Sequence, residues 1–507
     1  MKVIIYITYL LMLLPCFSIA QRITYSEPLK EDNRDIVFDI IGKMNGNILV
    51  FKNIRWKYAL TVYDADNMDL KEKINLDFMP DRTFNVDYVA FNDFFYLFYQ
   101  YQRKGIVYCM AAKMDGNGQK LGEPLQLDTT HVGLMGDNKI YSTINSDDKK
   151  KIMIFKIQKK DDRLNFVTLL YNEDLQLLHK TRQTLDYIER EDTYSDFLLD
   201  NEGNFLFAKS VKAGSRSNIS SLFLVTKSFA ADTFAINKIN LNNFFIDEVK
   251  MKVDNVNKRY IMNSFYYTER RGNIDGIFCA SWDVALGGAN AIVFTKLDES
   301  MRSEAKVKGN FKLAFNDFFI RNILLKKDGG YLITAEDYSS QTSGNNTGWN
   351  RYDYLYGSPF MNSYNYYYYN PSYLGYYRPY NRFNSNQTTR YYYDNILLLN
   401  VDKTGKVEWG KVINKEQYAD DNDNFLSFSI FNTGSEIHFL YNLIEKRDKL
   451  LTDNTVSANG QLKRNPTIKS LDKGFEFMPK LGKQISSRQI IVPCLLRNQV
   501  CFAKIDF

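Results

Sequence analysis

The chain repeats short strand-forming runs separated by tight turns, and this repeat limits the fold more than any other feature. Runs rich in β-branched and aromatic residues recur eight times, and each is entered from a turn. They are 46–53, 93–102, 149–157, 203–211, 259–268, 329–338, 435–445 and 487–496. Most are followed by a second run that ends in an acidic turn with Asp-x-x-Gly or Asn-Gly, because glycine adopts positive φ without steric cost. Each unit therefore reads as four strands over about 50 residues.

No convincing amphipathic helix lies between the units, so the expected fold class is a sandwich, a barrel or a propeller. A chain of 507 residues is longer than one sandwich core usually holds. A propeller instead grows by adding blades, each covering the next. The sequence therefore predicts an all-β fold, a β-propeller of about eight four-stranded blades, or of seven if the ends are misjudged.

The two ends of the chain predict how the ring closes. Residues 500–507 form the third strand of the last unit and no fourth strand follows them. Residues 22–29 precede the first unit and form a spare strand. Pairing this N-terminal strand with the C-terminal blade would remove two exposed sheet edges.

Two hairpins resemble those of known proteins. Within VDKTGKVEWGKV, residues Asp402, Gly405 and Trp409 resemble the Asp-x-x-Gly-x-x-x-Trp hairpin of secreted bacterial propellers. Residues 263–283 are similar to a blade hairpin of exported, Bacteroidota-type propeller proteins of no settled function. The two stretches cover only about a tenth of the chain, so the resemblance implies the fold and carries no active site.

The first 20 residues have the order of a secretory signal peptide. Lys2 is followed by an apolar run over residues 3–14 and by small residues at Ser18 and Ala20. The apolar run is too short to span a bilayer. We therefore expect residues 1–20 to be a signal peptide and the protein to be exported, either secreted, periplasmic or at the cell surface.

The remaining residues, 21–507, are expected to form a single domain that does not span a membrane. Cys16 raises the alternative of a lipid anchor, but the residues before it fit a lipoprotein signal poorly. The formal net charge of +6 is small, and the sequence has no cluster of Lys and Arg of the kind that binds a phosphate backbone. Nucleic acid is therefore not an expected partner.

Two of the cysteines have positions that predict a disulfide. Cys494 and Cys501 are equally distant from the expected turn at residues 497–498, so they lie opposite each other across a hairpin. A bridge is expected, although the hydrogen-bonded position of such a pair is the less common one. Cys109 and Cys279 fall in different units and are expected to be buried free thiols.

No reaction or cofactor is identified by motif. The three histidines, at 131, 179 and 438, lack metal-ligand spacing, and no nucleophile elbow, zinc-protease motif or phosphate loop occurs. Residues 115–119 resemble part of a calcium loop, but a hairpin turn explains them. No metal or cofactor is therefore expected.

Two acidic clusters precede the innermost strands of units four and seven, at residues 189–196 and 418–424. Connections between blades open on the same face as the loop between strands two and three of a blade. The tyrosine-rich insertion described next is such a loop, so all three features should share one face. Either cluster alone could be a solvated connection.

Unit six carries a long insertion over residues 339–394, and 15 of the chain's 36 tyrosines fall between 352 and 393. Such a loop is usually functional or disordered, and its aromatic density disfavours plain disorder. Residues 341–392 are expected to be removable without breaking a ladder hydrogen bond. The candidate binding residues are aromatic or arginine side chains: Trp349, Tyr352, Tyr354, Tyr366, Tyr367, Tyr376, Tyr377, Arg378 and Arg382.

Three roles for the insertion remain open: a binding lid, a loop that packs only on its own propeller, and a mobile or self-associating segment. The leading interpretation is a non-catalytic binding or scaffold protein that presents a Tyr-rich face to a protein or glycan at the cell envelope. The alternative is a polysaccharide hydrolase or lyase with carboxylates near the central channel. No oligomeric state is predicted.

Overall fold

The structure, a computed structural model, describes most of the chain. The described residues are 21–30, 36–54, 57–81, 83–132, 139–214, 217–305, 313–343, 349–356, 388–445, 448–468 and 474–507. Within these ranges no helix is long and apolar enough to cross a membrane.

The first four units follow one another along the chain, each with four strands. Unit one contains β2 (Val37–Met44), β3 (Asn47–Ile54), β4 (Lys57–Asp64) and β5 (Leu70–Asn75), and unit two contains β6 (Thr83–Ala90), β7 (Phe94–Arg103), β8 (Ile106–Asp115) and β9 (Leu125–His131). Unit three contains β10 (Tyr141–Asn145), β11 (Lys151–Lys160), β12 (Arg163–Asn172) and β13 (Leu177–Asp186), and unit four contains β14 (Asp192–Leu199), β15 (Phe205–Lys212), β16 (Ile219–Lys227) and β17 (Ala235–Ile239).

The later units repeat the pattern with small additions. The short strand β18 (Phe245–Ile246) precedes unit five, which contains β19 (Lys250–Asp254), β20 (Arg259–Tyr267), β21 (Gly276–Asp283) and β22 (Gly288–Lys296). Unit six contains β23 (Phe318–Leu325), β24 (Tyr331–Thr342), β25 (Thr389–Val401), β26 (Val407–Ile413) and the added β27 (Tyr418–Asp420). Unit seven contains β28 (Phe428–Asn432), β29 (Glu436–Glu445), β30 (Asp448–Ser457) and β31 (Leu462–Arg464), and unit eight contains β32 (Phe475–Phe477), β33 (Lys483–Ser486), β34 (Gln489–Leu496), β35 (Gln499–Asp506) and the N-terminal β1 (Arg22–Tyr25).

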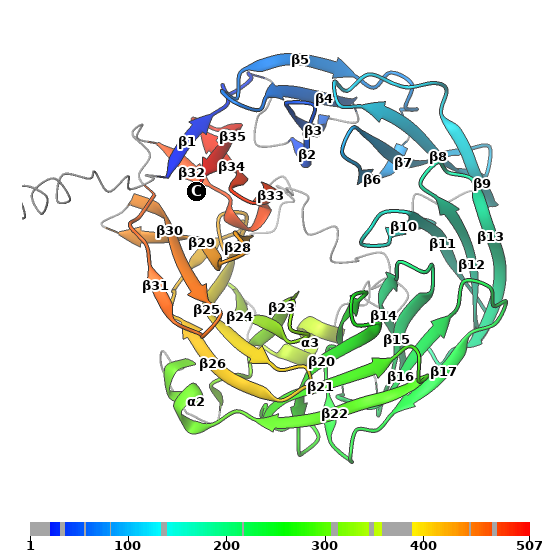
Figure 1. Ribbon diagram of the computed structural model, residues 1–507, viewed down its shortest axis with the longest axis vertical. Helices are drawn as coiled ribbons and strands as arrows, with labels where there is room; N and C mark the ends of the chain where they lie inside the picture. The colour runs from blue at the N-terminus through cyan, green and yellow to red at the C-terminus, as the bar shows by residue number, and fades with distance from the viewer. Residues whose placement is uncertain are drawn as a thin grey trace, which may run out of the picture.

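These strands form seven hydrogen-bonded sheets within the described residues, because β18 bridges units four and five into one nine-stranded sheet. Every named strand pairing is antiparallel. Each of the eight runs singled out in the sequence is the second strand of its unit, except that in unit eight two short strands, β32 and β33, precede β34 and both pair with it. The sheets stand around a common axis, with the first strand of each unit innermost and the last outermost (Figure 1). The described residues thus form an all-β, propeller-like arrangement.

The acidic turns fold as their sequences predict. Asp402 Oδ1 accepts hydrogen bonds from the backbone N–H groups of Thr404 and Lys406, at 2.8 and 2.9 Å. Gly405, at φ 89°, completes the reversal. The carboxylate of Asp115 caps its own turn in the same way, so residues 115–119 are a hairpin turn.

Apolar side chains gather where two units face each other. Among the described residues, eight hydrophobic clusters each draw on two neighbouring units, including a cluster that joins unit eight to unit one. In that last cluster the Phe502 ring lies 5.3 Å from the Phe38 ring and 5.8 Å from the Tyr63 ring, centroid to centroid. Both faces of each unit are therefore covered by a neighbour.

The N-terminal strand completes unit eight. β1 pairs antiparallel with β35 from Arg22↔Asp506 to Tyr25↔Ala503, and the Tyr25 ring stacks on Phe475 at 4.0 Å. The Ser26 N–H donates to the Phe502 carbonyl at 2.9 Å. The two ends of the chain thus lie in one sheet.

In the described part of the chain, three short helical segments differ from the sequence expectation of none: α2 (Glu299–Ala305), α3 (Arg351–Tyr356) and the 3-10 turn η3 (Pro479–Leu481). Asp298 accepts a hydrogen bond from the Met301 N–H at 2.8 Å and so caps α2. These segments are too short to show a helical period in the sequence, which explains why the pattern missed them.

Cys494 and Cys501 are directly opposite each other on β34 and β35, as expected. Positive φ values at Arg497 and Asn498 form the two-residue turn between them. Both thiols are buried and free, with 3.0 Å between their sulfur atoms, whereas a disulfide bond measures about 2.05 Å. Burial raises the pKa of the Cys494 thiol well above its usual value. The bridge between them stays a prediction.

Deleting residues 21–30 should lower the free energy of unfolding, because it removes β1 and exposes the edge of β35. Loss of the Ile23 and Tyr25 contacts should cost about 2–4 kcal/mol, measured as a lower Tm and urea midpoint. The exposed Arg22 provides the control, since Arg22→Ala should leave both values unchanged. An unchanged Tm for the truncated protein would count against a structural role for β1.

The predicted bridge can be tested in protein purified without reductant. A digest prepared without reductant should contain the peptides of Cys494 and Cys501 joined, while Cys109 and Cys279, which lie in separate units, should be alkylated after unfolding. Alkylation of all four thiols without reduction would rule the bridge out.

Candidate functional site

The stem of the tyrosine-rich insertion, defined here as residues 338–343, 349–356 and 388–393, is part of the folded ring. The ladder between β24 and β25 continues to Thr342↔Thr389, and β27 adds to β25 through Arg390↔Asp420. The Arg390 guanidinium pairs with the Asp420 carboxylate at 2.7 Å. The expectation that residues 341–392 could be removed without breaking a ladder was therefore wrong. The strands β24 and β25 extend beyond the apolar residues from which they were predicted.

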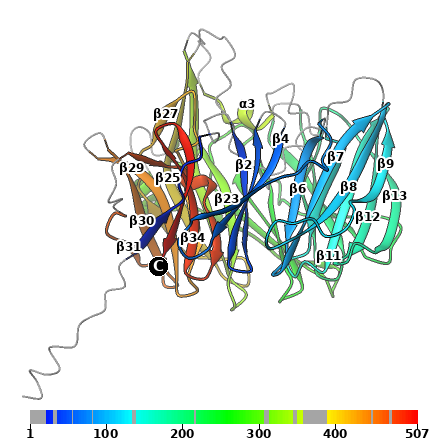
Figure 2. The same cartoon turned by 90° about the horizontal axis from the view of Figure 1, so that it is seen from above.

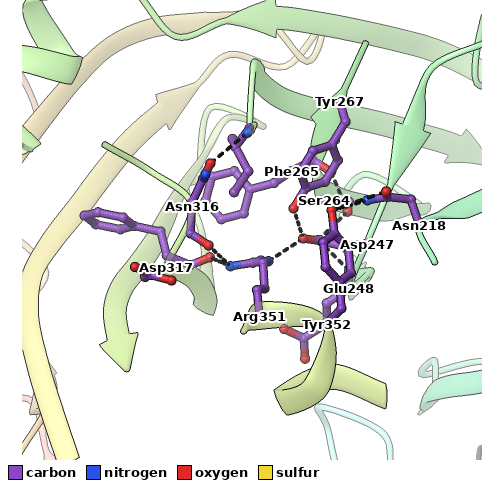
Figure 3. A network of polar contacts seen from close by, with 12 residues as sticks. Asn218, Asp247, Glu248, Ser264, Phe265, Tyr267, Asn316, Asp317, Arg351 and Tyr352 are labelled. Atoms are coloured by element: carbon purple, nitrogen blue, oxygen red, sulfur yellow. Dashed lines mark hydrogen bonds and ion pairs between the residues drawn. The ribbon is translucent and has the colours of Figure 1, made fainter. Parts of the chain in front are cut away.

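Helix α3 is held to the ring by a buried ion pair (Figure 3). The Arg351 Nε donates to Asp247 Oδ2 at 2.7 Å, and both side chains are almost fully buried. The same guanidinium donates to the backbone carbonyls of Asn316 and Phe318. Asp247 also accepts a hydrogen bond of 2.6 Å from the Tyr267 hydroxyl, whose pKa burial raises well above its usual value. Removing one partner of such a pair leaves an uncompensated buried charge, so α3 is firmly anchored.

Three of the predicted binding residues lie in this stem and contact the ring. The Trp349 Nε1 donates to Asp317 Oδ1 at 2.6 Å. The Tyr352 hydroxyl accepts a hydrogen bond of 3.1 Å from Asn218, as Figure 3 shows. The Tyr354 ring lies 4.8 Å from that of Phe319. The other six predicted residues lie outside the described residues, and their binding role stays a prediction: Tyr366, Tyr367, Tyr376, Tyr377, Arg378 and Arg382.

Both acidic clusters lie at the same end of the ring as the stem, as the sequence predicts. β27 belongs to the second cluster and pairs with β25. In the first cluster, the Glu191 carbonyl accepts a hydrogen bond from Lys212, which directly precedes the loop that carries Asn218. Figure 2 shows α3 and the long β24–β25 hairpin at this end. This end of the ring therefore brings together the insertion stem and two acidic connections.

A cavity of about 350 Å³ lies among the innermost strands of units one to five. Three carboxylates line it, from Asp39 on β2, Asp87 on β6 and Asp147 in the turn after β10. Lys252 on β19 lines another part of its wall. Sequence reasoning singled out none of these residues, because each sits in an ordinary strand or turn and only the ring brings them together.

Two of the cavity carboxylates have basic neighbours. The Tyr88 hydroxyl donates to Asp39 Oδ1 at 3.2 Å and accepts a hydrogen bond from the Lys483 ammonium. Burial raises the pKa of Asp39, although Lys483 opposes the change. Asp87 lies 3.8 Å from Lys139, and burial lowers the pKa of that lysine to about 8. The ammonium group of Lys139 is therefore easier to deprotonate than that of an exposed lysine.

Asp196 sits in a β-bulge of β14, next to Phe197 of the cavity wall. Its backbone has φ 54°, a region that few residues other than glycine, Asn and Asp adopt. The side chain is half-buried, but its Oδ2 atom is fully buried and has no hydrogen-bond partner in the described part of the chain. Burial raises the pKa of this carboxyl to about 6.

Metal binding finds no support in the described ranges, where no three His, Cys, Asp or Glu side chains gather as a metal site. The buried His438 instead bonds the Asp453 carboxylate at 3.0 Å, and His179 lies near Asp232. Both are structural contacts.

Comparisons with known proteins identify no family for this chain. No protein-family model and no curated protein matches the chain. Prolyl oligopeptidase B from Galerina marginata is similar in structure, with a TM-score of 0.40 and 9% identity, covering 92% of this chain and 56% of that enzyme. This chain thus spans little more than half the length of that protein.

For two further solved structures, the match covers a larger share of the other chain. The polysaccharide lyase Uly1 has a TM-score of 0.39 and 9% identity, covering 84% of this chain and 90% of that one. The apocarotenoid oxygenase of Synechocystis has a TM-score of 0.33 and 8% identity, covering 96% and 93%. Similarity at this level identifies no reaction, substrate or partner for this chain.

The raised pKa of Asp196 predicts a pH-dependent effect on stability. A carboxyl whose pKa is higher in the folded than in the unfolded state destabilises the folded state when it is ionised. The free-energy cost of ionising Asp196 therefore grows as pH rises from about 4 to about 6 and stays constant above that. Asp196→Asn keeps a residue that adopts positive φ and removes the charge. It should raise the free energy of unfolding at pH 8 by on the order of 1–3 kcal/mol and change it little at pH 4.

The control for this measurement is Asp161→Asn. Asp161 has the same φ of 54° but is exposed in a hairpin turn, so its replacement should change the free energy of unfolding little. Equal urea midpoints for wild type and Asp196→Asn at pH 8 would contradict the assignment.

Proposed function

We propose that this chain is an exported, eight-bladed β-propeller, closed by β1 on β35, that acts as a non-catalytic binding or scaffold protein. Its Tyr-rich insertion would meet a protein or glycan partner at the cell envelope. The eight units, each with at least four strands, and the apolar cluster between units eight and one support the blade count and the closure.

The anchoring of the insertion stem is the observation that carries this proposal. Tyr356 ends a helix fixed by the Arg351–Asp247 ion pair, and Thr388 precedes a strand fixed by ladders on both sides. The segment 357–387 is therefore attached at both ends to one end of the ring. A segment held in this way costs less ordering entropy on binding than a free tether.

The composition of the segment suits recognition. Tyrosine offers a large ring with a polar tip at a low cost in side-chain entropy, and arginine stacks on rings. Residues 357–387 contain the candidates Tyr366, Tyr367, Tyr376 and Tyr377 together with Arg378. A glycan or a protein surface offers complementary faces to both side-chain types.

The test replaces residues 357–387 with a short Gly/Ser linker and leaves α3 and β25 intact. Because loop-closure entropy changes slowly with length, the shortened protein should melt cooperatively near the wild-type Tm. It should no longer retain a cross-linked partner from the cell-envelope fraction. Tyr366→Ser, Tyr367→Ser, Tyr376→Ser and Tyr377→Ser together should weaken retention by at least about tenfold.

A matched control replaces four asparagines of the same segment, at 365, 370, 381 and 384, with serine. This control changes as many side chains but keeps every ring, so it should retain the partner. A shortened protein that folds and keeps all its partners would refute the binding role, and one that unfolds would show the segment to be structural.

A second candidate, a polysaccharide hydrolase or lyase, is favoured by one observation: carboxylates from three units line one cavity. Such an enzyme would release reducing ends or unsaturated sugars from an envelope polysaccharide. Loss of that release in Asp39→Asn and Asp87→Asn would support it, and its absence in the wild-type protein would exclude it for the polysaccharides tested.

A further inference from the structure

Strand β22, the outer edge of unit five, lacks the charges that protect other sheet edges. Its residues 288–295 contain no Asp, Glu, Lys or Arg, and Lys296 is its only charged residue. This uncharged run is longer than that of any other outer strand in the described part of the chain. The outer strand β5, for example, carries Lys71, Glu72 and Lys73 in succession. Charged side chains commonly keep an exposed edge from pairing with another chain, and β22 does without them.

The outer side of β22 can accept a further strand. β22 is the last strand of its sheet, and no strand lies beyond it in the described ranges (Figure 1). In an antiparallel ladder, every second residue points its N–H and C=O groups away from the partner strand. The register with β21 shifts at Asn290, which is left as a bulge. The regular part of the edge is therefore Ala291–Lys296.

Both faces of this regular part are apolar and half-buried. Ile292 and Phe294 pack on the apolar cluster between units four and five. Val293 lies opposite Cys279 of β21, which belongs to the cluster between units five and six. Val293 thus points to the other face of the sheet, together with its alternate neighbours Ala291 and Thr295.

A groove of about 640 Å³ lies beside the edge on the face of Val293. It is lined by Ala291 and Val293 from β22 and by two turns of unit six, which contain Gly329 and Lys403. The Arg259 guanidinium of β20 donates to the Lys403 carbonyl at 2.9 Å and also to the Gly329 carbonyl. These bonds hold both turns next to unit five. The groove leaves room for side chains of a strand added to β22.

We propose that β22 pairs antiparallel with the β22 strand of a second copy of this chain, about a twofold axis at Val293. In this register Ala291 lies opposite Thr295 of the second copy, and Ile292 lies opposite its Phe294. No charged side chain faces another within these pairs. Residues opposite each other on paired strands share a face, so Thr295 of the second copy points toward the groove beside Ala291.

The charge pattern is the reason for assigning a second copy of this strand. A twofold axis sets each residue of a strand against a residue of the same strand, so the strand must be complementary to itself. The same operation on β5, about Glu72, would set Lys71 against Lys73, and like charges directly opposite each other are destabilising. β22 has no such conflict. With about five residues paired in each copy, the interface is smaller than that of a permanent dimer, so association should be weak.

Sedimentation equilibrium of the purified protein, from about 5 to about 500 µM, should show a reversible dimer with a dissociation constant on the order of 10–100 µM. Val293→Lys and Val293→Glu should each weaken association at least about tenfold, because each places two like charges opposite each other. An equimolar mixture of the two variants should associate again, since opposite charges then face each other. Thr295→Lys, which places a charge on the same edge, should also weaken the dimer and gives a second readout.

Ile236→Lys is the matched control, because Ile236 is an exposed apolar residue on the outer strand β17 of unit four. This variant gains the same charge and should dimerise as the wild type does. A wild-type protein that stays monomeric at about 500 µM would overturn the proposal, and the edge would then be open to a strand of another protein. A dimer that survives both Val293→Lys and Thr295→Lys, or a mixture of folded Val293 variants that stays monomeric, would overturn it as well.

Discussion

Every sheet in this protein has two apolar faces, and the rest of the structure depends on covering both of them. A single four-stranded sheet cannot do so, because burial of apolar surface requires a second surface that fits against it. Each unit lies between two others, and unit eight meets unit one through Phe502 and Phe38. A sheet between two neighbours has both faces covered, whereas a sheet at the end of an open row would keep one face in water.

Part of the polar chemistry of the protein lies at the axis and at one end of the ring. The innermost strands face the axis, where the neighbour-to-neighbour packing that buries the rest of each sheet is incomplete. Bulges in β2, β14 and β23 add a residue to the inner strand, and in β14 and β23 a charged side chain, Asp196 or Arg321, falls in the bulge. Such bulges re-aim side chains without disturbing the outer strands.

The sequence was sufficient for features with a local cause and insufficient for those made by distant segments. The Asp402 turn, the second strand of each unit and the opposition of Cys494 and Cys501 follow from turn chemistry and strand period, and all three occur in the structure. The docking of Arg351 on Asp247 could not be predicted, because the residues are about a hundred positions apart and neither carries a motif. The cavity charges were missed for the same reason.

The tyrosine-rich insertion has some features that the local sequence predicts and others that depend on distant segments. The strand pattern on either side of the insertion predicts its place in unit six. Tyr338 and Tyr393 belong to these strands and pair with each other across the ladder. The contacts of Trp349 and Tyr352 depend on Asp317 and Asn218, which come from other parts of the ring. Aromatic density marked the segment as unusual, but it did not show which described rings contact the rest of the protein.

The pairing of β1 with β35 joins segments that are synthesised at very different times. At typical rates of translation, β1 waits on the order of a minute before β35 leaves the ribosome. During that time the inner side of β1 and, later, the edge of β35 are open to strands of other chains. A β1 strand that meets the β35 strand of a second copy forms the same hydrogen bonds as in its own ring. Crowded synthesis thus favours exchange of this strand between copies, which links monomers into chains without any change in the interface.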